Sequence, residues 1–122
     1  MSTSVKESLE QINQVSRQLL SRIQDMQNIL QESLQSKDDT STIIQETYNE
    51  LTRLISIRQS LITHLFEQNS TEEIKTQHLL INEMKALDTE LSIKYQTYKH
   101  ALADQLIKFK KSKKAAKSYK QY

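Results

Sequence analysis

Apolar residues recur at steps of three and four along most of the chain, a spacing that gathers side chains on one face of an α-helix. The first such segment covers residues 4–35, and its opposite face is polar and rich in glutamine. We therefore predict a long amphipathic helix there. Its apolar positions are Val5, Leu9, Ile12, Val15, Leu19, Ile23, Met26, Leu30 and Leu34.

A polar stretch, SKDDTST at residues 36–42, interrupts this pattern and predicts the first turn between helices. Thr42 and Gln45 have the spacing of a capping box, in which a hydroxyl and a longer polar side chain satisfy free amides at a helix start. The spacing therefore predicts a second helix over residues 42–67. Its apolar stripe runs through Ile44, Tyr48, Leu51, Leu54, Ile55, Leu61, Ile62 and Leu65, with Arg58 interrupting it.

A second capping box predicts the start of the third helix. Ser70 and Glu73 lie in the sequence EQNSTEEI, and two glutamates fall in what would be the first helical turn. From Ile74 to Phe109 the apolar residues recur about every 3.5 positions, a period that suits packing along a partner helix. We predict a helix over residues 71–110 that either continues as one rod or breaks near Ser112.

The composition supports a wholly helical fold. None of the 122 residues is glycine or proline, and tight hairpin turns and phosphate-binding loops depend on glycine. Short connections between long helices imply antiparallel neighbours. We expect one all-α domain over residues 1–122, an elongated antiparallel bundle of three long helices, with the C-terminal tail as a fourth if it folds back. Dimerisation would bury further apolar surface and stays open.

The sequence offers no recognisable catalytic or cofactor-binding arrangement. Cysteine is absent, so there is no thiolate metal site and no disulfide framework. The histidines, His64, His78 and His100, form neither an HExxH nor a Glu-x-x-His pair. We predict that the protein is not an enzyme and needs no cofactor or metal. It lacks a signal-peptide pattern and any apolar run of about 20 residues, so we expect a cytoplasmic protein.

Charge is divided unevenly along the chain. Residues 1–104 hold all 15 acids beside 10 Lys and Arg, a net charge of −5, whereas residues 105–122 carry seven lysines and no acid. Such a tail could bind nucleic acid, a membrane surface or a protein groove. Nucleic acid is disfavoured because the tail lacks arginine and the body is acidic. A membrane is disfavoured because the apolar strip of the tail is thin.

Two segments resemble the FliT family of flagellar export chaperones. They are LTRLISIRQSLITHLFEQ, with leucines around a central arginine, and LLINEMKALDTELSIKYQTYKHALADQLIKFKKSKKAAKSY, which ends in basic residues, a small residue and a tyrosine. The resemblance covers about residues 48–122. It implies an all-helical cytosolic chaperone that binds the C-terminal helical segment of the filament-cap protein and contacts the export ATPase and export gate. Some members also restrain a transcription activator.

Two sets of site residues follow from this resemblance and from the stripes. We expect a client groove in the seam between the second and third helices, lined by Leu51, Leu54, Arg58, Leu61, Ile62, Leu87, Leu91, Tyr95 and Tyr98. The resemblance also implies that the C-terminal helix covers the binding surface until it is displaced. Opposite charge on body and tail fits that role, so we expect a regulatory tail carried by Phe109, Lys113, Lys114, Ala116 and Tyr119.

Three alternative functions remain open at the level of sequence. The first is a chaperone for the hook–filament junction proteins. The second is a basic-tailed coiled-coil regulator of a transcription factor or of nucleic acid, whose affinity should fall steeply with salt. The third is a plain coiled-coil assembly protein. Binding of a helix in a groove would depend on apolar residues and much less on salt.

Overall fold

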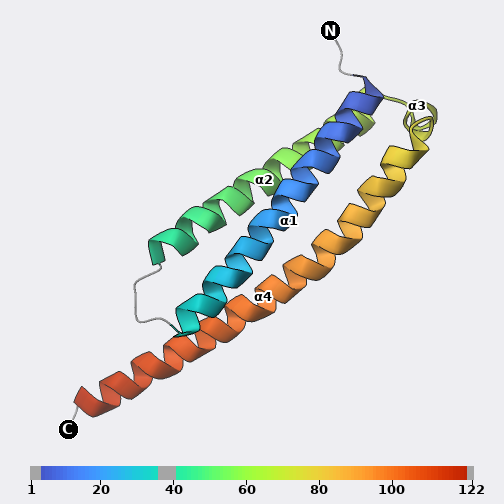
Figure 1. The fold of residues 1–122 in the computed structure, drawn as a ribbon. Coiled ribbons are helices and arrows are strands. Elements are labelled where there is room, and N and C mark those ends of the chain that lie inside the picture. Colours follow the sequence, from blue (N-terminus) through green and yellow to red (C-terminus); the bar gives the residue numbers. More distant parts are fainter. Residues whose placement is uncertain (1–3, 36–40, 121–122) are drawn as a thin grey trace.

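The computed structural model describes the backbone of residues 4–35 and 41–120, and the side chains of residues 4–32, 42–104 and 107. Within these residues the chain forms helices joined by short connections, in the order α1 (Val5–Gln35), α2 (Ser41–Gln68), α3 (Thr71–Lys75) and α4 (His78–Lys120). The elongated helical bundle predicted from the sequence is confirmed (Figure 1).

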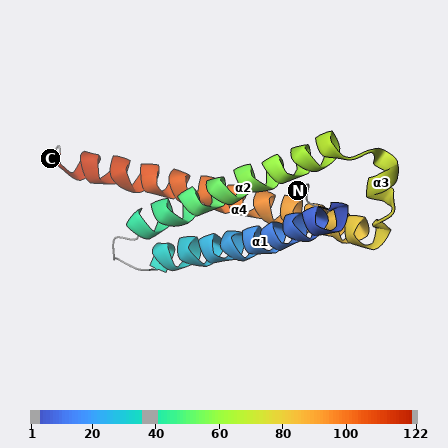
Figure 2. The same cartoon turned by 90° about the horizontal axis from the view of Figure 1, so that it is seen from above.

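Helix α1 lies between the other two long helices and packs against both of them. In Figure 1 the chain runs down α1, back up along α2 and down again along α4, so α1 and α4 are parallel neighbours and α2 is antiparallel to both (Figures 1 and 2). This arrangement follows from the continuous apolar stripe of α1. Six of its predicted members are buried: Leu9, Ile12, Leu19, Ile23, Met26 and Leu30.

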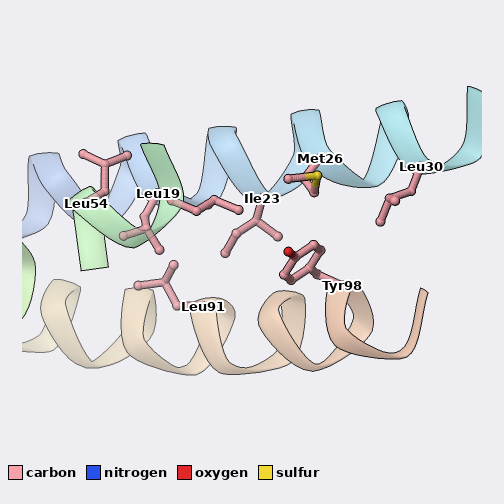
Figure 3. Close-up of a cluster of buried hydrophobic side chains, with 8 residues drawn as sticks. Leu19, Ile23, Met26, Leu30, Leu54, Leu91 and Tyr98 are labelled. Atoms are coloured by element: carbon pink, nitrogen blue, oxygen red, sulfur yellow. The ribbon is translucent and has the colours of Figure 1, made fainter. Parts of the chain in front are cut away.

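The core divides into two clusters along the bundle. One gathers Leu19, Ile23, Met26 and Leu30 of α1 with Leu51 and Leu54 of α2 and Leu91 and Tyr98 of α4 (Figure 3). The other joins Leu9, Ile12, Leu65 and Ile74 near the corner at α3. All three long helices contribute to the first cluster, which lies along the middle and the α1–α2 connection end of the bundle.

Helix α3 forms the corner between α2 and α4. The capping box predicted from the sequence is present: Ser70 Oγ accepts a hydrogen bond from the Glu73 amide at 3.2 Å, and the Glu73 carboxylate accepts from the Ser70 amide at 3.4 Å. The buried side chain of Ile74 holds this short helix against the core. The corner thus combines a satisfied helix start with a hydrophobic anchor.

Two expectations about helix starts are wrong. The predicted third helix is not continuous from residue 71, because α3 ends after one turn and α4 begins at His78. Thr76 ends α3, and its hydroxyl donates to the Glu73 carbonyl oxygen at 2.6 Å, a local bond that competes with helix continuation. Helix α2 begins at Ser41, so Thr42 lies inside the helix and cannot be its cap.

The C-terminal part of α4 continues the helix axis beyond the ends of α1 and α2 (Figures 1 and 2). Of the arrangements left open by the sequence, the structure therefore has the single rod rather than a tail folded back as a further helix. No helix in the described part of the chain is both long and apolar enough to cross a membrane.

Candidate protein-binding groove

An open groove with a volume of about 470 Å³ lies between α2 and α4, with α1 as its floor. We call it the α2–α4 groove. Buried Leu19 and Ile23 of α1 form the floor. The walls are Ile55, Arg58, Gln59, Ile62 and Thr63 of α2 and Leu91, Ser92 and Tyr95 of α4.

The groove exists because α2 and α4 each pack closely on α1 and less closely on each other. Half-buried Ile55, Ile62 and Tyr95 present apolar surface along its sides, and exposed Gln59 and Thr63 supply polar groups at its rim. An apolar interior with a polar rim is the arrangement in which grooves hold the apolar face of an amphipathic helix.

Arg58 connects all three long helices at this groove. Its Nε donates a hydrogen bond to the Ser16 hydroxyl of α1 at 2.8 Å, and its guanidinium forms an ion pair with Asp88 of α4. Ser16 is itself fixed by donating to the Ile12 carbonyl oxygen at 2.8 Å. The Arg58 side chain is 18% exposed and that of Asp88 47%, so the acid stands at the solvent edge and the base reaches inward.

Burial lowers the pKa of Arg58 from its ordinary value, but an arginine remains cationic at neutral pH. Arg58 is the one charged residue among the groove-lining residues. The ion pair with Asp88 compensates that charge, because an unpaired, partly desolvated cation would be costly. Arg58 therefore has a structural role in joining the helices and places a cation in the groove wall.

Tyr95 in the groove wall contacts Tyr98 in the core beneath it. Their ring centroids lie 5.8 Å apart with the planes tilted by 47°, and the Lys99 Nζ lies 4.8 Å from the centre of the Tyr95 ring. Tyr98 is buried in the core, and burial, together with nearby Tyr95 and Tyr48, raises the pKa of its phenol. Tyr95 is half-buried and lines the groove.

The structure divides the residues expected in the client groove into three groups. Arg58, Ile62, Leu91 and Tyr95 line the α2–α4 groove. Leu51, Leu54, Leu87 and Tyr98 are buried. Leu61 instead lines a shallow depression on α2 with Ser56, Ile57, Ser60 and His64. Four of the nine thus meet at one surface, and the buried residues support the helices beneath it.

The residues expected in the regulatory tail, Phe109, Lys113, Lys114, Ala116 and Tyr119, have side chains outside those the structure describes. Their backbone belongs to the last turns of α4.

Sequence reasoning missed the floor of the groove and its polar rim. Leu19 and Ile23 belong to the apolar stripe of α1, and their sequence pattern is the same as that of ordinary core residues, so it does not identify them as the floor of a groove. Gln59 and Thr63 could have been found, because they follow Ile55 at four and eight positions and so lie on one side of α2. In the residues described, no cluster of three or more potential metal-binding side chains occurs.

The fold and groove define a helical protein with a surface suited to binding another helix. The chain belongs to the FliT family: the family model described as flagellar protein FliT matches residues 6–121. This family is one of flagellar export chaperones, which bind flagellar export substrates. The match includes α1, which the resemblance seen in the sequence did not. Comparisons with curated proteins and with solved structures gave no match.

Proposed function

We propose that this chaperone holds the C-terminal helical segment of the filament-cap protein in the α2–α4 groove, in the cytoplasm, before export. The observation that carries the proposal is the half-buried apolar surface of Ile55, Ile62 and Tyr95 above an apolar floor. The role is one of binding, without catalysis or a cofactor.

The size of the groove favours side chains as its occupants. Its volume of about 470 Å³ lies in the range of small-ligand pockets, roughly 300–1,000 Å³, whereas a helix with side chains is about 10–12 Å across. A client helix would therefore lie along the groove and insert a few apolar side chains. Each buried Å² of apolar surface would contribute about 25 cal/mol.

A blocking substitution tests this proposal without disturbing the core. Ser92 is an exposed residue on the groove wall, so Ser92→Trp should fill the groove. We expect binding of the cap protein's C-terminal segment, measured by calorimetry, to weaken at least about tenfold, which corresponds to about 1.4 kcal/mol. The matched control is Ser60→Trp, an exposed position on α2 that does not line this groove.

The possible outcomes distinguish a wrongly assigned binding surface from a wrongly assigned client. If both substitutions weaken binding equally, or if neither weakens it, the binding surface lies elsewhere. Wild-type protein that ignores the cap segment but binds the terminal segment of a hook–filament junction protein would support that alternative client. Loss of binding to export ATPase or gate fragments in Ser92→Trp alone would indicate that those partners share the groove.

We also propose that the tail from Phe109 onward regulates client access. Its net charge of +7 over residues 105–122, beside a body of −5, favours fast but weak docking. In this structure the tail continues the axis of α4 beyond α1 and α2, so docking requires the last turns of α4 to bend back. A docked tail that must be displaced lowers apparent client affinity by the fraction of molecules left open. Deleting residues 109–122 should therefore tighten client binding in calorimetry. Weaker binding on deletion would make the tail a direct client contact.

A further inference from the structure

The charge that lines the α2–α4 groove lies in the middle of its apolar α2 wall. Arg58 is three residues after Ile55 and four before Ile62, and all three side chains line the groove. Positions three and four apart lie on one side of a helix, so the cation has an apolar neighbour on each side. The two isoleucines are roughly 10 Å apart along the helix axis, because each residue adds 1.5 Å.

The protein uses only part of the hydrogen-bonding capacity of Arg58. A guanidinium carries five N–H groups in a planar fork. Nε donates to the Ser16 hydroxyl and Nη2 pairs with the Asp88 carboxylate, whereas Nη1 has no acceptor among the residues that the structure describes. The two N–H groups of Nη1 are therefore available to a bound partner.

The acid that pairs with Arg58 lies at the solvent edge of the groove. The side chain of Asp88 is 47% exposed, against 18% for Arg58. An exposed carboxylate that leaves its partner is solvated by water and loses little, whereas a partly desolvated cation left unpaired is costly. A second carboxylate that entered the groove would keep the cation compensated, so it could compete with Asp88.

The geometry of the groove indicates which kind of carboxylate would enter. The fork of a guanidinium matches a carboxylate in shape and charge. Because the apolar lining continues past Arg58 in both directions, a helix lying along the groove would present a side chain there rather than its terminus. We propose that Arg58 selects clients by binding an aspartate or glutamate side chain of the client helix, in competition with Asp88.

This inference rests on the client-binding role proposed above, and it specifies a pattern in the client. Two apolar residues seven positions apart would lie opposite Ile55 and Ile62, with the acid three or four positions from each. The apolar contacts supply most of the affinity. The acid supplies specificity, because a helix without it leaves Arg58 paired only with Asp88.

Substitutions in the client test for the carboxylate. The probe is the C-terminal segment of the cap protein as a synthetic peptide, bound to the full-length chaperone in calorimetry. When each acidic residue in turn is replaced by its amide, one replacement should weaken binding about tenfold. We call that variant the neutral peptide. Amidation of the terminal carboxylate should leave the affinity unchanged. Weakening by no replacement, or by terminal amidation alone, would overturn the proposal.

Substitutions in the chaperone test whether the effect belongs to Arg58. Asp88→Asn removes the competing charge, so it should tighten binding of the original peptide about threefold and leave the neutral peptide unchanged. Asp25→Asn, which removes the same charge from an exposed ion pair of α1, should change neither. Arg58→Gln should bind both peptides equally. Lys99→Gln removes the cation beside the Tyr95 ring and should keep the tenfold difference.

The Asp88→Asn result decides if Arg58→Gln does not fold, because Asp88 is half-exposed. Unchanged binding of the original peptide by Asp88→Asn, or a difference between peptides that disappears in Lys99→Gln, would overturn the proposal. Ser92→Trp separates this inference from the proposed function. If it weakens binding but no acid matters, only the selection by Arg58 is wrong. If it weakens neither peptide, the groove is not the client site.

Discussion

The two faces of α4 show how one helix can serve two different surfaces. Leu91 points into the core and is 8% exposed, whereas Ile93, two residues later, is 62% exposed on the side of α4 that faces away from α1. Both residues are large and aliphatic, so composition does not separate them. The difference arises from position alone: α1 covers one side of α4, and the described residues leave the other side open.

The same comparison distinguishes α4 from α1. Helix α1 has its apolar residues on one side and glutamine-rich polar residues on the other, as expected of a helix with one buried face. Helix α4 is apolar on its inner side and partly apolar on its outer side. Among the described residues, exposed large apolar side chains therefore occur on α4 and not on α1.

The largest expected effect separates the two faces directly. Leu91→Ala removes buried methyl groups and should lower the free energy of unfolding by about 2–5 kcal/mol. Ile93→Ala on the exposed face should change it by less than about 0.5 kcal/mol. Urea unfolding of dilute protein, followed by circular dichroism, measures both. Equal losses of unfolding free energy would show that the outer face is packed in solution, and would contradict the difference between the two faces.

A second prediction concerns the link between α2 and α4. Arg58→Met keeps much of the apolar stem but removes the bonds to Ser16 and Asp88, and should cost about 1–3 kcal/mol. In a double-mutant cycle with Asp88→Asn, the coupling energy should lie at roughly 0.5 kcal/mol or above. The control pair is Arg22 and Asp25, an exposed ion pair within α1. Coupling no larger than in that pair would mean that the Arg58 ion pair does not hold the groove walls together.

The corner at α3 sets where α4 begins and therefore which residues face inward. Ser70→Ala removes the hydroxyl that accepts from the Glu73 amide, and should destabilise the protein by about 1 kcal/mol. Ser60→Ala, an exposed serine within α2, is the control and should be neutral or slightly stabilising because alanine favours helices. A neutral Ser70→Ala would show that buried Ile74 alone anchors the corner.

The smallest expected effect is a change in the free energy of unfolding at alkaline pH, caused by Tyr98 on the inner side of α4. Because burial raises the pKa of Tyr98, the folded state retains the phenolic proton more tightly than the unfolded state. The contribution of Tyr98 to stability is fully present below the pKa of a tyrosine in the unfolded chain, about 10. It is lost as the pH rises through the higher pKa of Tyr98 in the folded state. Tyr98→Phe should flatten the fall in stability above about pH 10, whereas Tyr48→Phe, at an exposed tyrosine, should not. Matching profiles for the two variants would contradict this assignment.

The fold could be predicted from the sequence because its signals are local. The stripes of α1 and α2, and the capping box at Ser70 and Glu73, depend only on neighbours three and four residues away. The break at Thr76 could not be predicted from the sequence. A side-chain hydroxyl that donates to the carbonyl oxygen three residues earlier is compatible with either a continued or an ended helix. The same ambiguity applied to Thr42, which carries the spacing of a cap but lies inside α2.

The groove could be predicted only in part because it depends on distances between helices. The stripes indicate which residues face a neighbour, and Ile62, Leu91 and Tyr95 were found on that basis, whereas Arg58 was found through the family resemblance. They do not indicate how far apart α2 and α4 lie. That separation decides that Tyr95 lines a groove while Tyr98, three residues later, is buried. Ile55 and the floor residue Ile23 became part of the site for the same reason.

The most direct test of the two-face account is a methyl spectrum of isoleucine-labelled protein. Ile23, Ile55 and Ile62 report on the α2–α4 groove, and Ile93 and Ile107 report on the exposed outer side of α4. Titration with the cap protein's C-terminal segment should shift the first three signals and leave the last two unchanged. Shifts confined to Ile93 and Ile107 would contradict the account, because the client would then bind the outer face of α4.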